Sequence, residues 1–186
     1  MAVGAVLTQG TAWRNAERAI DNLRREGALC PEGLSRISPS ALRKHIAAAG
    51  FQRRKAATLG LLSELAGNTE TGWRALLATP ATELRGRLQS VRGIGPETAD
   101  AILLYAGRCP AFVIDAYTRR FAVRHALADR KAGYAAMKEL FESSLPADPD
   151  LYAEYHALLV ALGKEFCRTQ PRCADCPLRR DLPEAR

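Results

Sequence analysis

The chain has 186 residues, of which 47% are hydrophobic and 25% are charged. This balance is typical of an ordered globular protein with one large or two small domains, and it excludes a disordered tail. No apolar run is long enough to cross a membrane, and the start of the chain lacks a basic targeting region, so we expect a cytoplasmic protein. The formal net charge of +7 favours a polyanionic partner such as nucleic acid.

Nearly every periodic segment of the chain has helical spacing. Ser38-Pro39 and Thr79-Pro80 each combine a capping residue with a proline suited to the first turn of a helix. The expected helices span residues 3–25, 39–49, 54–66, 73–78, 81–91, 96–106, 116–128, 131–143 and 151–166. Only residues 111–114 have an extended pattern, and one short strand does not make a sheet. The predicted fold class is therefore all-α.

The most informative stretch joins two of these helices through Gly93-Ile94-Gly95. Glycine permits positive φ and lets the backbone approach a ligand closely, while Pro96 begins the second helix. The N-terminus of that helix then offers N–H groups to a phosphate. Gly-x-Gly alone is explained by a plain helical corner, but the longer pattern L-x-x-V-x-G-I-G resembles the helix-hairpin-helix motif that binds the DNA backbone. We expect Gly93, Ile94, Gly95 and Thr98 at the DNA.

Asp115 follows Val113-Ile114 and precedes a helical pattern, so it fits the N-cap of a helix. Capping alone would explain an isolated aspartate. The combination of the hairpin, a short extended segment and Val-x-Asp-x-x-x-x-Arg resembles the helix-hairpin-helix base excision superfamily, and within it endonuclease III. The residues that carry this resemblance run along the whole chain: Val6 to Gln9, Gly50 to Lys55, the hairpin, Asp115 to Arg120 and a cysteine-containing tail.

The resemblance implies two helical lobes with DNA in the cleft between them. Residues 34–128 would form a six-helix barrel that bears the hairpin, and residues 1–33 and 129–186 would form the second lobe. The implied partner is double-stranded DNA containing a damaged base, bound by a monomer associated with a bacterial or archaeal nucleoid. The first helix begins almost at Met1 without a cap, which fits a natural start and the loss of an upstream segment about equally well.

The resemblance also assigns roles to site residues. An aspartate at the position of Asp115 stabilises positive charge on the sugar and assists attack at C1′, as carboxylates do in glycosidic cleavage. The damaged nucleotide must first be flipped out of the duplex. Gln9 matches the residue that fills the resulting gap, although an exposed glutamine at a helix bend explains it nearly as well. Arg120 is a further expected DNA contact.

One position departs from the family pattern. Bifunctional members carry a lysine two residues after the second glycine, and this lysine forms a Schiff base that leads to strand cleavage. The matching residue here is Glu97, which cannot do so, and Lys55 and Lys131 are the remaining candidates. We therefore expect a monofunctional glycosylase acting on alkylated purines such as 3-methyladenine. The alternatives are endonuclease III activity on oxidised pyrimidines and abasic sites, and an inactive DNA-binding relative.

The C-terminal cysteines resemble the iron–sulfur loop of endonuclease III, whose spacing is C-x6-C-x2-C-x5-C. In this chain the spacing is C-x5-C-x2-C, one residue short at the first interval, and the fourth position is Leu182. Three thiolates so placed can hold a cluster and order a loop that has no core of its own. The resemblance therefore implies a [4Fe-4S] cluster held by Cys167, Cys173 and Cys176. The fourth ligand is open between Asp181, Cys30 and Cys109, and a zinc site or no metal remain alternatives.

Two further residues have open roles. His156 lies on an apolar helix face, where a histidine is more often a core residue than a catalyst. Tyr117 lies close to Asp115 in the sequence and fits the wall of a base pocket or ordinary packing equally well.

Overall fold

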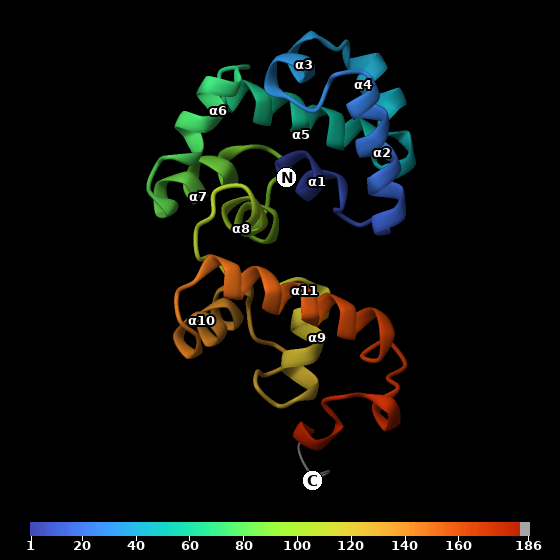
Figure 1. The fold of residues 1–186 in the computed structure, drawn as a ribbon, viewed down its shortest axis with the longest axis vertical. Helices are drawn as coiled ribbons and strands as arrows, with labels where there is room; N and C mark the ends of the chain where they lie inside the picture. Colours follow the sequence, from blue (N-terminus) through green and yellow to red (C-terminus); the bar gives the residue numbers. More distant parts are fainter. Residues whose placement is uncertain (183–186) are drawn as a thin grey trace. The chain divides into compact units, whose positions relative to one another are not determined.

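The computed structural model describes residues 1–182, whose regular structure consists of α-helices and short 3₁₀ turns with no strand (Figure 1). The predicted all-α class is confirmed. None of the described helices is long and apolar enough to span a membrane. The chain divides into two compact units, Met1–Gly107 and the part from Arg108 onward. The lobes expected from the sequence, residues 34–128 and residues 1–33 with 129–186, stay a prediction.

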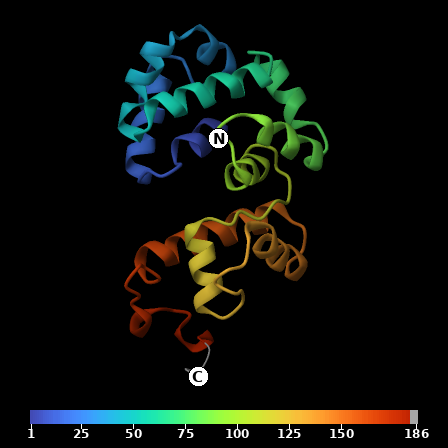
Figure 2. The ribbon, with the colours of Figure 1, turned by 180° about the vertical axis from the view of Figure 1, so that it is seen from behind.

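The first unit is built around a short helix, α1 (Ala2–Leu7), which packs against α2, α5 and α8 and lies in the middle of the unit in both views (Figures 1 and 2). Val6 and Leu7 on this helix are fully buried. The N-terminal residues therefore belong to the core of the first unit. Its other elements are α2 (Trp13–Arg25), α3 (Pro31–Arg36), α4 (Pro39–His45), η1 (Ala47–Ala49), α5 (Gln52–Leu65), α6 (Glu70–Leu77), α7 (Ala81–Ser90) and α8 (Pro96–Tyr105).

The single helix expected over residues 3–25 is wrong, because the chain turns between α1 and α2. Gly10 adopts a φ of +58°, which is the left-handed region. The Thr8 hydroxyl donates to the carbonyl of Gly4, 3.0 Å away, and so caps the end of α1. This turn presents Gln9 as part of a loop. Helix α3 was not expected either, although Pro31 occupies its first turn.

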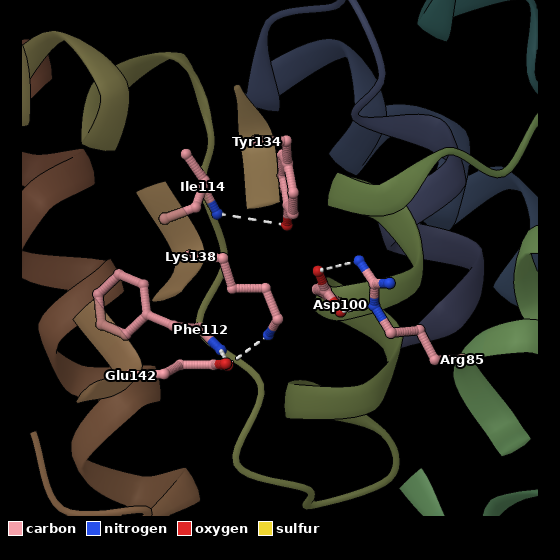
Figure 3. A network of polar contacts seen from close by, with 7 residues as sticks. All are labelled: Arg85, Asp100, Phe112, Ile114, Tyr134, Lys138 and Glu142. Atoms are coloured by element: carbon pink, nitrogen blue, oxygen red, sulfur yellow. Dashed lines mark hydrogen bonds and ion pairs between the residues drawn. The ribbon is translucent and has the colours of Figure 1, made fainter. Parts of the chain in front are cut away.

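The second unit contains α9 (Ala116–Arg124), α10 (Tyr134–Ser144), α11 (Pro149–Glu165), η2 (Cys173–Asp175) and η3 (Arg179–Asp181), and α9 packs against α11. The segment 111–114 is extended and buried, but no strand pairs with it. Side chains of α10 accept hydrogen bonds from the backbone of segment 111–114 instead. The Phe112 N–H donates to Glu142 at 2.8 Å, and the Ile114 N–H donates to the Tyr134 hydroxyl at 3.5 Å (Figure 3). Lys138 forms an ion pair with the same glutamate.

The core of the second unit is aromatic. The ring of Phe112 stacks on that of Phe141, with centroids 4.5 Å apart, and meets the edge of Tyr152 at 5.2 Å. Offset and edge-to-face pairs of this kind add to the stabilisation from burial. They hold the extended segment rigidly against α10 and α11, immediately before Asp115.

Candidate functional site

The hairpin between α7 and α8 needs glycine at its first position. Gly93 has a φ of +97°, and a Cβ atom built there would lie 2.2 Å from the Thr58 hydroxyl oxygen. Gly95 instead has an ordinary φ of −90° as the N-cap of α8, with open space around it. Ile94 between them is buried, and its N–H donates to the carbonyl of Val91 at 3.0 Å. Ile94 therefore anchors the turn from inside, while Gly93 and Gly95 are exposed.

Side chains from two distant segments hold this hairpin in place. The Thr58 hydroxyl on α5 lies 3.0 Å from the Arg92 carbonyl oxygen and donates to it. The Gln9 amide nitrogen donates to the Gly93 carbonyl at 2.9 Å and to the Thr98 hydroxyl at 2.8 Å. Gln9, Gly93 and Thr98, which we selected from the sequence, thus meet at one place in the first unit.

An ion pair ties the two hairpin helices together. Arg85 on α7 contacts both carboxylate oxygens of Asp100 on α8, at 2.7 Å and 3.1 Å (Figure 3). The Asp100 side chain is completely buried, whereas that of Arg85 is one-third exposed. Bidentate pairing of this type fixes geometry as well as charge.

Lys55 on α5 is fully buried and bonded at two points. Its ammonium group donates to the carbonyls of Leu7 and Ala49, each at 2.8 Å. Burial lowers the pKa of Lys55, and the nearby positive charge of Arg54 adds to this effect. One side chain therefore joins the end of α1 to the end of η1.

The turn that follows η1 exposes a phenylalanine. Phe51 has a left-handed φ of 45° and is 63% exposed, and the Arg54 guanidinium lies 5.5 Å from its ring centroid. A Cβ atom added to Gly10 would lie 3.8 Å from the ring, which places Phe51 beside the turn that carries Gln9. Phe51 is not among the site residues expected from the sequence. An apolar residue between a glycine and the basic pair Arg53-Arg54 was the available signal.

The residues considered for lyase chemistry have different environments. Glu97 is exposed in the first turn of α8. Lys55 is buried, as described above. Lys131 is exposed in the turn before α10, where its N–H donates to the Asp129 carboxylate at 2.6 Å.

Asp115 is the N-cap of α9, as predicted. Its Oδ1 accepts a hydrogen bond from the Thr118 N–H at 2.7 Å, and its Oδ2 lies 3.6 Å from Nε2 of His156 on α11. Burial raises the pKa of Asp115, but the contacts with His156 and with the Thr118 N–H outweigh burial and hold it below the usual value. Asp115 is therefore an ionised, largely buried carboxylate. The role of His156 could not be read from its helical spacing.

Arg120 and Tyr117 serve packing within the second unit. The Arg120 guanidinium lies 5.2 Å from the ring centroid of Tyr117 and donates to the carbonyls of Gly163 and Cys167. The Tyr117 ring packs so closely on Gly163 that a Cβ atom there would lie 2.2 Å from it. Arg120 thus joins α9 to the end of α11, and its expected contact with DNA stays a prediction.

The three C-terminal cysteines do not form a ligand set in this structure. Cys167 is buried, and its sulfur accepts a hydrogen bond from Arg124 at 3.2 Å. Cys173 and Cys176 are half-buried at η2. Within residues 1–182, no three histidine, cysteine, aspartate or glutamate side chains come together in a way that could hold a metal ion. The [4Fe-4S] cluster expected at these cysteines stays a prediction.

Comparisons with known proteins agree on one family. A family model described as "HhH-GPD superfamily base excision DNA repair protein" matches residues 3–147. A Methanocaldococcus jannaschii protein, provisionally named a DNA repair glycosylase, is 43% identical over 95% of this chain and 81% of its own. The endonuclease III of Sulfolobus acidocaldarius is 26% identical over 95% of this chain and 78% of its own.

Two solved structures are also similar. A non-covalent complex of endonuclease III with DNA superposes with a TM-score of 0.82 at 20% identity, and the match covers 98% of this chain and 81% of that one. A 3-methyladenine DNA glycosylase of Helicobacter pylori, bound to 1,N6-ethenoadenine, has a TM-score of 0.75 at 25% identity, covering 88% of this chain and 83% of that one. The first likeness shows an endonuclease III-like fold.

Proposed function

The chain belongs to the HhH-GPD superfamily of base excision DNA repair proteins and is a DNA glycosylase of the endonuclease III family, and on that premise we propose that it excises alkylated purines without cutting the strand. The observation that carries the proposal is Glu97, a carboxylate in the first turn of α8 at the position of the lyase lysine. A carboxylate cannot form a Schiff base with C1′.

The other lysines support the same conclusion. Lys55 has its ammonium group bonded to two backbone carbonyls inside the first unit, so it is held away from any substrate. Lys131 is accessible, but it lies in a turn that carries no motif for nucleophilic attack. Water is therefore the nucleophile that we propose.

Asp115 is the group that we propose for the chemistry. Cleavage of the N-glycosidic bond builds positive charge on the sugar, which a fixed carboxylate stabilises. As the bond to the base breaks, water attacks C1′ and loses a proton to the solvent, which leaves a hydroxyl group on C1′. An alkylated purine carries a positive charge and leaves as a neutral base, so it needs less assistance than a neutral oxidised pyrimidine. The similarity to a 3-methyladenine glycosylase supports this choice of substrate.

We propose that the first unit binds DNA through the hairpin and through the two turns that carry Gln9 and Phe51. The exposed backbone at Gly93 and Gly95 suits a phosphate, with Arg92 exposed next to it. The exposed ring of Phe51 suits insertion between base pairs, as apolar wedges do when a nucleotide is flipped. Gln9 is hydrogen-bonded to the hairpin, so entry into the duplex would require it to release Gly93 and Thr98.

The test is an excision assay on duplexes that each carry one alkylated, oxidised or deaminated base, read with and without alkali. We expect release of 3-methyladenine, strand cleavage only after alkali, no borohydride-trapped adduct, and loss of activity in Asp115→Asn. A trapped adduct would establish the endonuclease III reading instead. If the wild type and Asp115→Asn are alike on every lesion, the catalytic role of Asp115 is rejected, and if neither excises any base, the inactive DNA-binding alternative is favoured.

An iron–sulfur cluster remains a proposal that rests on the cysteine spacing alone. If it forms, the Cys167 sulfur would exchange its hydrogen bond from Arg124 for a bond to iron, and Cys173 and Cys176 would supply the other thiolates. Iron and sulfide analysis of anaerobically purified protein tests this, with Cys176→Ser as the comparison. Protein without iron, or with zinc in its place, would reject the cluster.

A further inference from the structure

We propose that His156 positions Asp115 for catalysis, an inference that rests on the proposed glycosylase function. Helical spacing alone marks His156 as a core residue, because Tyr152 and Leu159 on the same face of α11 are buried. The side chain nevertheless points a ring nitrogen at the one carboxylate to which we assign the chemistry. An apolar residue would satisfy the packing without that contact.

The two oxygens of Asp115 have different partners. The Thr118 N–H holds Oδ1 at 2.7 Å, which is the ordinary N-cap contact. A single hydrogen bond at Oδ1 restrains the carboxylate but tolerates small rotations about its Cβ–Cγ bond, because that torsion is broad. His156 approaches Oδ2 from a different helix, with its Nε2 at 3.6 Å. This second contact limits those rotations further, and contacts of this length in substrate-free enzymes often tighten when substrate binds.

Burial strengthens this contact. The exposed fractions of the His156 and Asp115 side chains are only 14% and 15%. Little water is present to compete for Oδ2 or to screen the interaction. The packing of α9 on α11 holds the two residues together within one compact unit.

A histidine suits the chemistry better than a lysine or arginine would. Nε2 of His156 faces Oδ2 at 3.6 Å, which is longer than a hydrogen bond, and in the substrate complex it would approach and donate to Oδ2 while the negative charge stays on Asp115 for the developing cation. No proton is transferred in this role. His156 acts through Asp115, so it is a positioning residue.

Two substitutions separate the polar contact with Asp115 from packing. His156→Leu removes the donor, and His156→Gln places an uncharged amide donor close to the position of Nε2. We expect His156→Leu to slow single-turnover excision about 10- to 100-fold, with unchanged affinity for DNA containing an abasic-site analogue. We expect His156→Gln to recover most of that loss. Thermal unfolding of each variant shows whether it is folded.

A double-mutant cycle tests whether His156 acts through Asp115. In the Asp115→Asn background, where residual excision is followed over long incubations, His156→Leu should have little further effect, because the group that it positions is absent. An equal fold-loss in both backgrounds would overturn the proposal. So would a glutamine variant as slow as the leucine variant, or a leucine variant as fast as the wild type.

A measurement without substrate keeps this inference separate from the proposed function. Carboxyl ¹³C titration should show a higher pKa for Asp115 in His156→Leu than in the wild type, since the contact with His156 helps to lower it. An unchanged pKa would overturn the pairing even if the wild type is active. A wild type that excises no base would reject the proposed function, while the titration would still decide whether the pairing exists.

Discussion

Gly93 is the residue at which backbone conformation and packing both require glycine. Its φ of +97° is strained for any other residue, and a Cβ atom would lie 2.2 Å from the Thr58 hydroxyl oxygen. We expect Gly93→Ala to lower the free energy of unfolding by about 1–3 kcal/mol and to weaken DNA binding, because the hairpin must shift. Chemical denaturation and a DNA-binding titration measure the two effects.

The matched control for this change lies two residues away. Gly95 has a φ of −90° and open space where a Cβ atom would stand, so Gly95→Ala should leave stability nearly unchanged. If Gly93→Ala and Gly95→Ala lower the free energy of unfolding equally, then the left-handed φ and the close contact with Thr58 do not explain why position 93 needs glycine.

Asp115 makes stability depend on pH in the acid range. Burial raises its pKa, but the contacts with His156 and with the Thr118 N–H hold it below the usual value. A carboxyl with a depressed folded pKa contributes stability that is present above its unfolded pKa, about 3.9, and is lost as the pH falls through the folded value. The wild type should therefore lose stability relative to Asp115→Asn as the pH falls below about 4.

Thermal unfolding of both proteins at a series of pH values measures this difference. Asparagine is also a good N-cap residue, so the start of α9 is matched between the two proteins. Parallel pH profiles would show that Asp115 titrates at its unfolded value and that its contacts do not stabilise the ionised form.

Helix α5 is the element that organises the proposed DNA-binding side of the first unit. Lys55 joins the ends of α1 and η1, and Thr58, one turn later, holds the hairpin through the Arg92 carbonyl. The turns that carry Gln9 and Phe51 and the turn of the hairpin are thus attached to a single helix. Such attachment preorganises a binding surface, which reduces the entropy lost on binding.

Lys55→Met tests this role with little change in side-chain volume. The change removes the donor from two buried carbonyls, at a cost of roughly 1–3 kcal/mol for each, while the desolvation of the ammonium group is relieved. We expect a net loss of stability and a weaker affinity for DNA containing an abasic-site analogue. Lys44→Met is the control, because Lys44 is exposed on α4. Comparable losses in both variants would argue against the attachment.

Helices whose ends are marked by a capping residue or a first-turn proline could be predicted from the sequence. Helix boundaries that depend on tertiary contacts could not. Pro39 and Pro96 in first turns and the N-cap at Asp115 mark α4, α8 and α9 correctly. The turn at Gly10 was missed because α1 and α2 share one continuous apolar pattern, and only the burial of α1 among other helices separates them. Segment 111–114 lacks strand partners because α10 satisfies its backbone, which spacing cannot reveal.

The residues of the candidate site also divide into those that a sequence motif identifies and those whose roles depend on tertiary contacts. The sequence pattern located Gln9, Gly93 and Thr98, which the structure brings together, because motif resemblance carries spatial information. Lys55 and His156 acquire their roles from partners far away in the sequence, and the exposure of Phe51 depends on a left-handed backbone. The local spacing of such residues predicts whether they lie in the core or on the surface, but it does not indicate their function.

At the scale of the whole molecule, the residues that we propose for DNA binding and those that we propose for catalysis lie in different compact units. The first unit contains the hairpin, Gln9 and Phe51, and the second contains Asp115 and His156. The excess of basic residues, 27 against 20 acidic ones, gives the chain its net charge of +7. Such a charge steers association with DNA without selecting a lesion, so we assign affinity to charge and backbone contacts and selection to the chemistry.

Salt dependence tests that assignment through Arg92, which is exposed directly before Gly93. Each phosphate neutralised by a side chain contributes about −0.9 to the slope of log affinity against log salt concentration. We expect Arg92→Ala to make the slope less steep by about 0.9 and to weaken binding to damaged and undamaged duplexes by the same factor. Arg74→Ala is the control. This substitution removes the same formal charge, but Arg74 forms an ion pair with Glu70 at 3.2 Å and is not part of the hairpin. An equal change of slope in both variants would show that net charge, and not a phosphate contact at the hairpin, sets the affinity.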